Sequence, residues 1–366
     1  MPAEGKAENE LDVLVLGPFP PPLGGISVFV QRLHRQLVRR GLRVAVLNHF
    51  RSAADAPEVL GTLARNPLRY WWALRRVRSS VVHYHHSSRA SILVAVALVA
   101  QRDPRRFVVT LHGPLPSLRS RVPFVRAMTA WSLRAFDSVV AVSAEVVDQI
   151  AGIVPRERVI VLPAFLPPDR AEIGALALDD EAANFVAGGE PTIVTSAYKV
   201  ARGSSDDLWG LDIAVDAFVR MAPRHPSARL AMFVAVPPQD ARSRAYWDDL
   251  RTRIRESGLE PRVLTRFGAP LLAALGPNTI YVRPSRSDGD AVSLREALAL
   301  GVPAVATDVV GRPDGVHVVG GIDPDSVARV LAELVERPPE RAAAAVDADD
   351  AVETMIGAYG LPATGR

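Results

Sequence analysis

Residues 279–310 predict a strand, a polar loop, a helix and a second strand in direct succession. Ile280 and Val282 give the first strand its β-branched apolar character, and Pro284 ends it. The helix is expected over residues 291–300. Two consecutive strands joined through a helix run parallel, and in open parallel sheets ligands bind at the carboxyl ends of the strands. Loop 285–290, which follows the first strand, therefore lies where a ligand is expected.

The same alternation of strands and helices continues through the whole chain. A proline- and glycine-rich segment, 163–191, separates two such series and is expected to connect two domains. Strand-helix alternation on both sides of a connector predicts two doubly wound α/β domains rather than one barrel. The predicted strands are 11–16, 43–47, 81–85, 107–111, 138–142 and 159–162 in the first series, and 192–195, 228–234, 262–266, 278–282, 303–307 and 316–319 in the second.

Composition excludes several classes of protein. A chain of 366 residues with 48% hydrophobic residues is long and apolar enough to bury a core in each of two domains. It contains no cysteine, so neither disulfides nor thiolate metal sites are available. Residues 1–10 are polar and acidic, unlike a signal peptide, and the longest apolar helical run, 92–100, is too short to span a membrane. These features predict a cytoplasmic protein.

Two acids stand out in the unit described first. Asp288 lies in the loop, and Glu296 follows about two turns into the helix. Ionised carboxylates only accept hydrogen bonds, which suits a ligand rich in hydroxyl groups. The alternative is that Asp288 or Asp290 merely caps the helix and Glu296 is a solvated charge.

This acidic unit resembles the motif of retaining glycosyltransferases of family 4, which have the GT-B fold. The resemblance rests on Asp288 through Leu298, followed by Gly301-Val302-Pro303. It implies that Asp288 contacts the donor sugar and Glu296 the ribose of a nucleotide sugar, with Asp290 and Ser293 as further donor-binding residues. Two departures are present: Asp288 replaces the usual Glu, and Asp290-Ala291 replaces Phe-Gly. These departures favour a donor sugar different from the common ones.

The resemblance also implies the domain plan. Two Rossmann-like domains would face each other across a cleft. Residues 1–165 would form the acceptor-side domain and residues 166–345 the donor-binding domain. The last segment, 346–366, would form a helix that crosses back to the first domain.

A glycine pair follows the first predicted strand. The loop 17–27 is rich in proline, and Gly24 and Gly25 come directly before a predicted helix, 27–40. Bare backbone N–H groups at a helix N-terminus can receive a phosphate, although the loop does not fit a dinucleotide fingerprint. A simple connector is the alternative. The loop matches the first loop of the family, in which the glycine pair lies near the donor diphosphate.

Histidines cluster at two predicted strand ends. His83, His85 and His86 end one strand and His112 ends the next. A metal site is disfavoured, because residues alternate along a strand and no carboxylate is near in sequence. A polar edge of the binding site is the better interpretation. In the family, a histidine at the position of His112 faces the donor sugar, although a purely structural role is the alternative.

The basic residues that bind the donor diphosphate in the family are missing from their usual positions in this chain. The family places an Arg after the strand 192–195 and a Lys before the next helix, where this chain has Trp209. Lys199 is the predicted substitute and Arg202 the reserve. Apart from Lys6, Lys199 is the sole lysine in a chain that otherwise uses Arg, although chance is the alternative.

Charge is distributed unequally. Residues 1–170 carry 23 Lys and Arg against 12 Asp and Glu, whereas the remainder is acidic. The segment from Arg65 to Arg78 interleaves arginines with Trp71 and Trp72, as interfacial membrane helices do. Peripheral contact with the inner face of a membrane is therefore expected, unless the aromatic face packs on the domain. No nucleic-acid motif accompanies the charge.

Together, these features predict a retaining, metal-independent glycosyltransferase of the hexosyltransferase type. It would need no cofactor besides its nucleoside-diphosphate sugar, and would transfer the sugar to a carbohydrate or lipid-linked acceptor in polysaccharide or glycolipid assembly. Two alternatives remain: a nucleotide-sugar-binding protein without turnover, and an epimerase-like GT-B enzyme.

Overall fold

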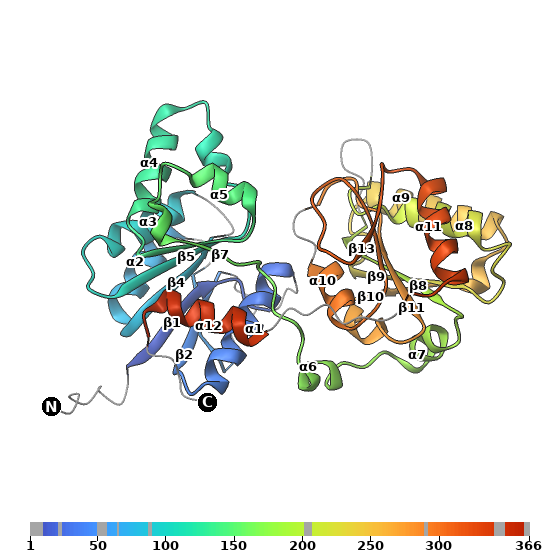
Figure 1. Cartoon of the computed structure of the whole chain (residues 1–366), viewed down its shortest axis with the longest axis horizontal. Helices are drawn as coiled ribbons and strands as arrows, with labels where there is room; N and C mark the ends of the chain where they lie inside the picture. Colours follow the sequence, from blue (N-terminus) through green and yellow to red (C-terminus); the bar gives the residue numbers. More distant parts are fainter. Residues whose placement is uncertain are drawn as a thin grey trace. The chain divides into compact units, whose positions relative to one another are not determined.

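A computed structural model describes residues 10–20, 24–49, 57–63, 66–86, 90–200, 207–288, 292–339 and 348–361. The chain divides into two compact units (Figure 1). The first comprises Met1–Leu166 together with Asp347–Arg366, and the second comprises Pro167–Val346. Both are α/β units with an all-parallel sheet, as the sequence predicts.

The first unit is built on a seven-stranded sheet of order β3-β2-β1-β4-β5-β6-β7. Most of its strands are buried along nearly their whole length, because helices cover both faces. The strands are β1 (Leu11–Gly17), β2 (Val44–Asn48), β3 (Val59–Thr62), β4 (Ser79–His86), β5 (Arg106–Leu111), β6 (Ser138–Ala141) and β7 (Val159–Val161).

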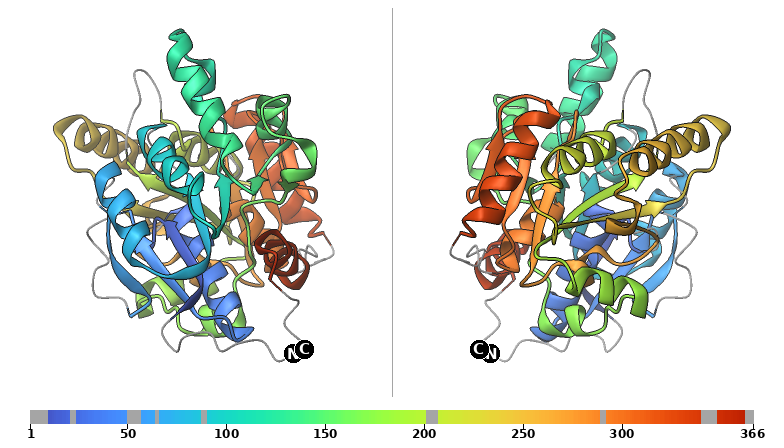
Figure 2. Two further views of the ribbon diagram at one scale, coloured as in Figure 1. Left: turned by 90° about the vertical axis from the view of Figure 1, so that its left-hand side faces the viewer. Right: turned by 90° about the vertical axis from the view of Figure 1, so that its right-hand side faces the viewer.

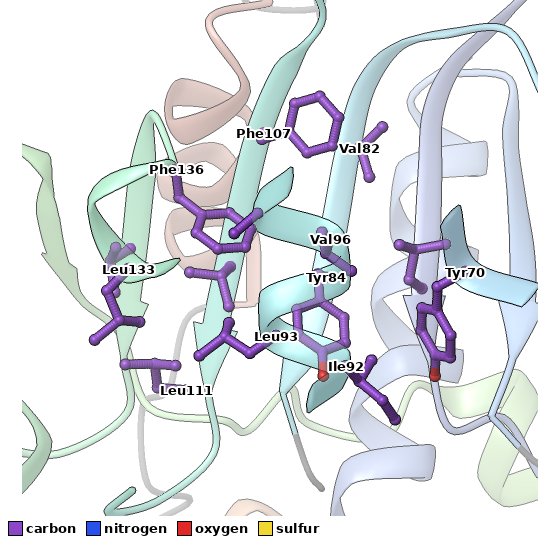
Figure 3. Packing of buried hydrophobic residues seen from close by; sticks show 14 of the residues in the cluster. Tyr70, Val82, Tyr84, Ile92, Leu93, Val96, Phe107, Leu111, Leu133 and Phe136 are labelled. Carbon is purple, nitrogen blue, oxygen red and sulfur yellow. The ribbon is translucent and has the colours of Figure 1, made fainter. Parts of the chain in front are cut away.

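Different helices cover the two faces of this sheet. Helices α2 (Pro67–Arg76), α3 (Ala90–Ala100), α4 (Pro123–Arg134) and α5 (Ala144–Ile150) contribute to one core. Figure 3 shows Tyr70 and Tyr84 among the aliphatic and aromatic side chains of this core. Helices α1 (Gly25–Arg39) and α12 (Ala348–Tyr359) form the other core, so the last helix belongs to the first unit.

The second unit has a six-stranded sheet of order β10-β9-β8-β11-β12-β13. Its strands are β8 (Thr192–Lys199), β9 (Arg229–Val236), β10 (Val263–Phe267), β11 (Thr279–Arg283), β12 (Ala304–Thr307) and β13 (Val316–Val319). Helices α8 (Leu211–Met221), α9 (Ala241–Glu256) and α11 (Pro324–Glu336) pack on one face, and α7 (Asp180–Ala187) and α10 (Val292–Ala299) on the other. Figure 2 shows these layers from two sides.

In both units the strand order reverses beside the first strand. The chain moves outward from β1 through β2 to β3 and then returns to place β4 on the other side of β1, and β8 to β11 repeat this pattern. At such a switch point the loops after the two central strands diverge and leave a crevice at their carboxyl ends. Loops after β1 and β4, and after β8 and β11, are therefore the expected ligand-binding positions.

Some elements differ from the prediction. Strand β3 is not among the predicted strands. Within the segment that contains Trp71 and Trp72, helix α2 begins at Pro67, and the Asn66 side chain accepts a hydrogen bond from the Leu68 N–H. The connector 163–191 contains the short helices α6 (Arg170–Gly174) and α7, capped by Asp169 and Asp179. Residues 271–274 form one 3₁₀ turn between β10 and β11.

Helix α12 is held to the first sheet by both apolar and polar contacts. Val352, Met355 and Ile356 are buried on it. The Tyr359 hydroxyl lies 2.8 Å from Nδ1 of His83 on β4, and Arg106 Nε donates to the Ala358 carbonyl. The helix therefore completes the second core of the first unit.

Candidate active site

The loop after β11 contains an acid enclosed by two arginines. One Asp288 carboxylate oxygen accepts hydrogen bonds from Arg283 Nε at 2.7 Å, Arg312 Nη1 at 3.0 Å and the Ser285 hydroxyl at 3.1 Å. The other accepts from Arg283 Nη2 at 3.0 Å. Side-chain exposure is 7% for Asp288, 13% for Arg283 and 2% for Arg312. The candidate sugar-binding acid is thus oriented by a buried cluster with one excess positive charge.

The electrostatics of this cluster favour the charged forms. Burial raises the pKa of Asp288, but the hydrogen bonds and charges of Arg283 and Arg312 outweigh burial and hold that pKa below its usual value. Burial lowers the pKa of Arg283, and its interactions with Asp288 and Tyr281 together raise that pKa by more. Asp288 therefore stays ionised and Arg283 stays protonated throughout the neutral pH range.

Arg312 also ties two strand ends together. Its Nε donates to the Thr307 carbonyl at 2.7 Å and its Nη2 to the Ser285 hydroxyl at 3.2 Å. The Thr307 hydroxyl in turn donates to the Ser285 carbonyl at 2.6 Å. Hydrogen bonds thus connect the loops after β11 and β12 to each other beside Asp288.

A series of hydrogen-bonded hydroxyl groups lies at the start of α10, the helix that contains Glu296. The buried Tyr281 hydroxyl donates to the Ser293 hydroxyl at 2.7 Å, and the Ser196 hydroxyl lies 2.7 Å from Tyr281. The Tyr281 hydroxyl has one proton, which it donates to Ser293. In the second hydrogen bond, Ser196 is therefore the donor and Tyr281 the acceptor. This chain links the ends of β8 and β11 to the start of α10. Glu296 lies one turn farther on this helix and is 7% exposed.

Lys199 is the last residue of β8 and is exposed. Strand β8 pairs with β11, so Lys199 lies at the same edge of the sheet as the Asp288 loop. Lys199 forms no ion pair with any of the residues that the structure describes. Asp290 and Arg202, two further predicted site residues, lie outside the described residues.

The loop before α8 differs in character from a phosphate-binding loop. The Asp207 carboxylate accepts hydrogen bonds from the backbone N–H groups of Trp209 and Leu211 and from the Tyr246 hydroxyl. Burial raises the pKa of Asp207, and these hydrogen bonds oppose that shift. A side-chain carboxylate of the protein thus occupies the anion-binding end of α8.

Gly210 explains how closely this loop approaches the Asp288 loop. Its φ is +74°, and a Cβ atom there would lie 2.0 Å from the Pro284 carbonyl oxygen. Arg286 spans the two loops, donating to both Asp212 carboxylate oxygens, at 2.7 and 2.9 Å, and to the Asp207 carbonyl. Only glycine has both the conformation and the small size required at position 210.

In the first unit, the glycine pair begins α1. Gly24 is extended, and its N–H donates to the Ser27 hydroxyl at 2.9 Å, while that hydroxyl donates to the Gly24 carbonyl at 3.0 Å. Both Gly24 and Gly25 are exposed. The N-terminus of a fifteen-residue helix, with no acid in its first turn, is a favourable position for an anion.

His112 follows β5 and contacts a second histidine. Its Nε2 lies 2.9 Å from Nδ1 of His85 on β4, and the two rings stack with centroids 5.2 Å apart. Burial, together with the nearby His86, lowers the pKa of His112 to about 3, so its ring is neutral at pH 7. The predicted histidine cluster is therefore a set of packed, uncharged rings.

The described residues contain neither a candidate metal site nor a candidate membrane-spanning helix. No group of three or more histidines, acids or cysteines suited to a metal ion occurs in the described ranges. Within the same ranges, no helix is long and apolar enough to cross a membrane. On α2, Trp71 and Trp72 are 40% and 52% exposed, with Arg75 and Arg76 stacked over their rings. Arg65 lies outside the described residues.

Four residues contact the predicted site residues although no sequence pattern marks them as partners: Arg283, Arg312, Tyr281 and His85. Arg283 and Tyr281 are strand residues, and Arg312 follows Asp288 only after 24 positions. Alternation along β4 places His85 on the same face as His83, which was the one available signal for a contact at the end of β5.

Comparison with known proteins agrees with this architecture. The family Glycosyltransferase Family 4 matches residues 23–170, and the family Glycosyl transferases group 1 matches residues 200–337. A lipopolysaccharide core biosynthesis mannosyltransferase, LpcC of Rhizobium leguminosarum bv. viciae, is 24% identical over 370 residues, which cover 95% of each chain.

Two solved structures illustrate the shared fold. A glycosyltransferase from Rickettsia africae superposes with a TM-score of 0.68 at 13% identity, covering 95% of this chain and 94% of its own. HepE of Anabaena, solved in complex with UDP-glucose, gives a TM-score of 0.62 at 15% identity over 95% of this chain and 94% of its own. The two family matches fall one in each unit and together span most of the chain. The chain belongs to glycosyltransferase family 4 and is a nucleotide-sugar-dependent glycosyltransferase of the GT-B fold.

Proposed function

We propose that the enzyme transfers a hexose from a nucleoside-diphosphate sugar to a growing glycan, with retention of anomeric configuration and without a metal ion. The similarity to a lipopolysaccharide core mannosyltransferase over nearly the whole chain supports a role in lipopolysaccharide or polysaccharide assembly. The observation that supports the proposal is that the candidate site residues of the second unit lie near the carboxyl ends of two neighbouring strands. Asp288, Ser293 and Glu296, together with Lys199, come from the loops and helix at the adjacent ends of β8 and β11.

In the reaction, the bond between the anomeric carbon and the diphosphate oxygen breaks, and its electron pair leaves with the nucleoside diphosphate. The acceptor oxygen forms the new bond, and its proton leaves with the diphosphate. Fixed hydrogen-bond donors stabilise the growing negative charge. In the second unit we assign this role to Lys199. In the first unit, the Gly24 N–H already donates to the Ser27 hydroxyl, so the proposed phosphate donor of the glycine pair is the Gly25 N–H at the exposed start of α1.

The sugar and nucleoside are held by oxygen acceptors. Glu296 is assigned to the ribose hydroxyls and Asp288 to the donor sugar. Arg283, Arg312 and Ser285 orient the Asp288 carboxylate, which as an ionised acid offers only hydrogen-bond acceptors to sugar hydroxyls. In the first unit, His112 is assigned a polar contact with a sugar hydroxyl. The acids are thus binding groups and do not act as the general acid and base of a glycosidase.

The test is acceptor-dependent release of nucleoside diphosphate from a panel of UDP- and GDP-hexoses, with membrane glycolipid extract as acceptor. NMR of the product should show the anomeric configuration of the donor, and excess EDTA should leave the rate unchanged. Binding without release would instead support a nucleotide-sugar-binding protein. Activity lost in EDTA and restored by Mg²⁺ or Mn²⁺ would contradict metal independence.

We also propose that helix α2 docks the enzyme on an anionic membrane that carries the acceptor. Leu68, Trp71 and Trp72 are exposed apolar side chains on one short helix, and Arg69, Arg75 and Arg76 on the same helix are exposed as well. Exposed tryptophans beside arginines suit the interface between lipid head groups and acyl chains. The excess of basic residues before residue 170 would add long-range attraction.

A further inference from the structure

A cavity in the first unit lies apart from the candidate active site. Its volume is about 630 Å³, and residues from α2, from the end of α3 and from the start of β4 line it, together with residues just before β5. Strands β1, β4 and β5 are parallel, so the cavity lies at the amino edge of the sheet, opposite the loops after β1 and β4. It is therefore separate from the loops that are expected to bind the sugar donor.

Arginines dominate the charge of this cavity. Two acids line it, Glu10 and Asp103, against four arginines, Arg75, Arg78, Arg102 and Arg105. Asp103 already accepts hydrogen bonds from Arg105, at 2.8 Å from Nε and 2.5 Å from Nη2. The other three arginines are exposed, and none of them forms an ion pair with a residue that the structure describes. The cavity therefore attracts anions.

Arg105 also covers the negative end of helix α2. Its Nη1 donates to the Val77 carbonyl at 2.9 Å and its Nη2 to the Leu74 carbonyl at 2.5 Å. Carbonyl groups in the last turn of a helix lack helical partners and carry the negative end of the helix dipole, which would repel an anion. Because Arg105 binds two of these carbonyls, the end of α2 does not cancel the attraction of the exposed arginines.

Apolar side chains form the rest of the cavity wall. Trp71 on α2 is 40% exposed and Leu98 on α3 is 52% exposed, and both line the cavity. The Arg75 guanidinium lies over the Trp71 ring, 4.4 Å from its centroid. A small soluble anion would leave these apolar surfaces in water, whereas a ligand with an acyl chain would bury them. The wall thus favours a ligand that joins an anionic group to an apolar chain.

We propose that this cavity binds one anionic phospholipid. Arg75, Arg78 and Arg102 would hold the phosphate, and the first part of the acyl chains would lie against Trp71 and Leu98. For the identity of its ligand the inference rests on the proposed docking of α2, because that helix contributes both to the cavity and to the docking surface. It adds a site for a single lipid to a general attraction between arginines and the membrane.

Calorimetric titration of the full-length protein with short-chain lipids, below their critical micelle concentrations, tests the site without a membrane surface. Dihexanoyl phosphatidylglycerol should bind with saturation. Dihexanoyl phosphatidylcholine, which has no net charge, and glycerol 3-phosphate, which lacks acyl chains, should each bind at least roughly tenfold more weakly. Equal affinity for phosphatidylcholine would overturn recognition by charge. Equal affinity for glycerol 3-phosphate would show a site for soluble anions and overturn the lipid assignment.

A matched pair of double variants locates the binding. Arg78→Gln combined with Arg102→Gln removes two cavity charges outside α2, and should weaken phosphatidylglycerol binding roughly thirtyfold. Arg121→Gln combined with Arg158→Gln removes the same charge from exposed positions of the first unit outside the cavity, and should bind as the wild type does. Equal affinities of the two double variants would overturn the proposed site.

Liposomes separate this site from the docking of α2. Saturable binding of monomeric phosphatidylglycerol that depends on Arg78 and Arg102 supports the site even if the protein ignores anionic liposomes, and only the docking proposal then fails. Salt-dependent binding to anionic liposomes without binding of the monomeric lipid would support docking and refute the lipid site.

Discussion

The Asp288 carboxylate is expected to stabilise the second unit as well as bind sugar. Asp288→Ala would leave the buried guanidinium groups of Arg283 and Arg312 without their anion. Removing one partner of a buried ion pair typically costs about 3–5 kcal/mol, because the remaining charge is uncompensated. Urea unfolding should therefore show a loss of this size, in addition to any loss of donor affinity.

A matched control for this prediction is Asp308→Ala, because Asp308 is exposed and accepts one hydrogen bond from the Gly321 N–H. Its effect should stay within about 1 kcal/mol, as for an exposed hydrogen bond. Equal unfolding free energies for Asp288→Ala and wild type would contradict the role given to the arginines.

The predicted acids could be found from sequence because their spacing on a loop and helix is a local property. Their partners could not. Arg283 and Arg312 reach Asp288 from a strand end and from a different loop, and the directions of long side chains depend on tertiary packing. The same reason explains His85, whose contact with His112 crosses between neighbouring strands.

Helix α2 is the element on which the membrane proposal can be tested. Liposomes containing anionic lipid should bind the protein at low salt and release it as salt rises, since screening weakens the attraction. Replacing Arg69, Arg75 and Arg76 with Gln should abolish binding and leave nucleotide-sugar affinity intact.

A matched control for α2 is the change of Arg251 and Arg255 to Gln on α9, where both arginines are exposed. These variants should bind liposomes as the wild type does. A wild-type protein that ignores anionic liposomes at low salt would refute the membrane proposal but not the transferase activity.

Helix α12 gives a prediction about stability. Tyr359→Phe removes the hydroxyl beside His83 Nδ1 and leaves a buried ring nitrogen without that partner. The expected cost is about 1–3 kcal/mol in unfolding of the first unit. Tyr198→Phe is the matched control, because Tyr198 is 44% exposed. Identical unfolding curves for Tyr359→Phe and wild type would contradict this account.

Most helices and strands could be predicted from their apolar periodicity. The elements that were not predicted are short and have few buried residues. Strand β3 has only four residues, of which Val59 alone is buried, so no alternation is visible. Helices α6 and α7 are short and depend on Asp169 and Asp179 as caps within a segment whose prolines and glycines suggested a loop.

The molecule as a whole should lose stability in mild acid because of its first unit. Burial lowers the pKa of His83 and His112 to about 3 and that of His86 to about 4, whereas an unfolded histidine titrates near 6.5. Between these values the unfolded chain binds more protons than the folded chain, so stability falls as pH falls below about 6.5.

Each such histidine contributes roughly 1.4 kcal/mol per pH unit within this window. Thermal unfolding between pH 7.5 and pH 5 measures the effect, and His83→Gln should flatten the slope. Tm values that do not change over this range would contradict the buried, neutral state of the cluster.

The central claim is that the carboxyl edge of the second sheet binds a nucleotide sugar through Glu296 and the Asp288 loop. Calorimetric titration of UDP- and GDP-hexoses, and of UDP and GDP alone, into wild type and Glu296→Ala tests it most directly. The account predicts that Glu296→Ala weakens nucleotide and nucleotide sugar by the same amount, roughly 1–3 kcal/mol, because the ribose is common to both. Unchanged affinities for every ligand that binds the wild type would contradict it.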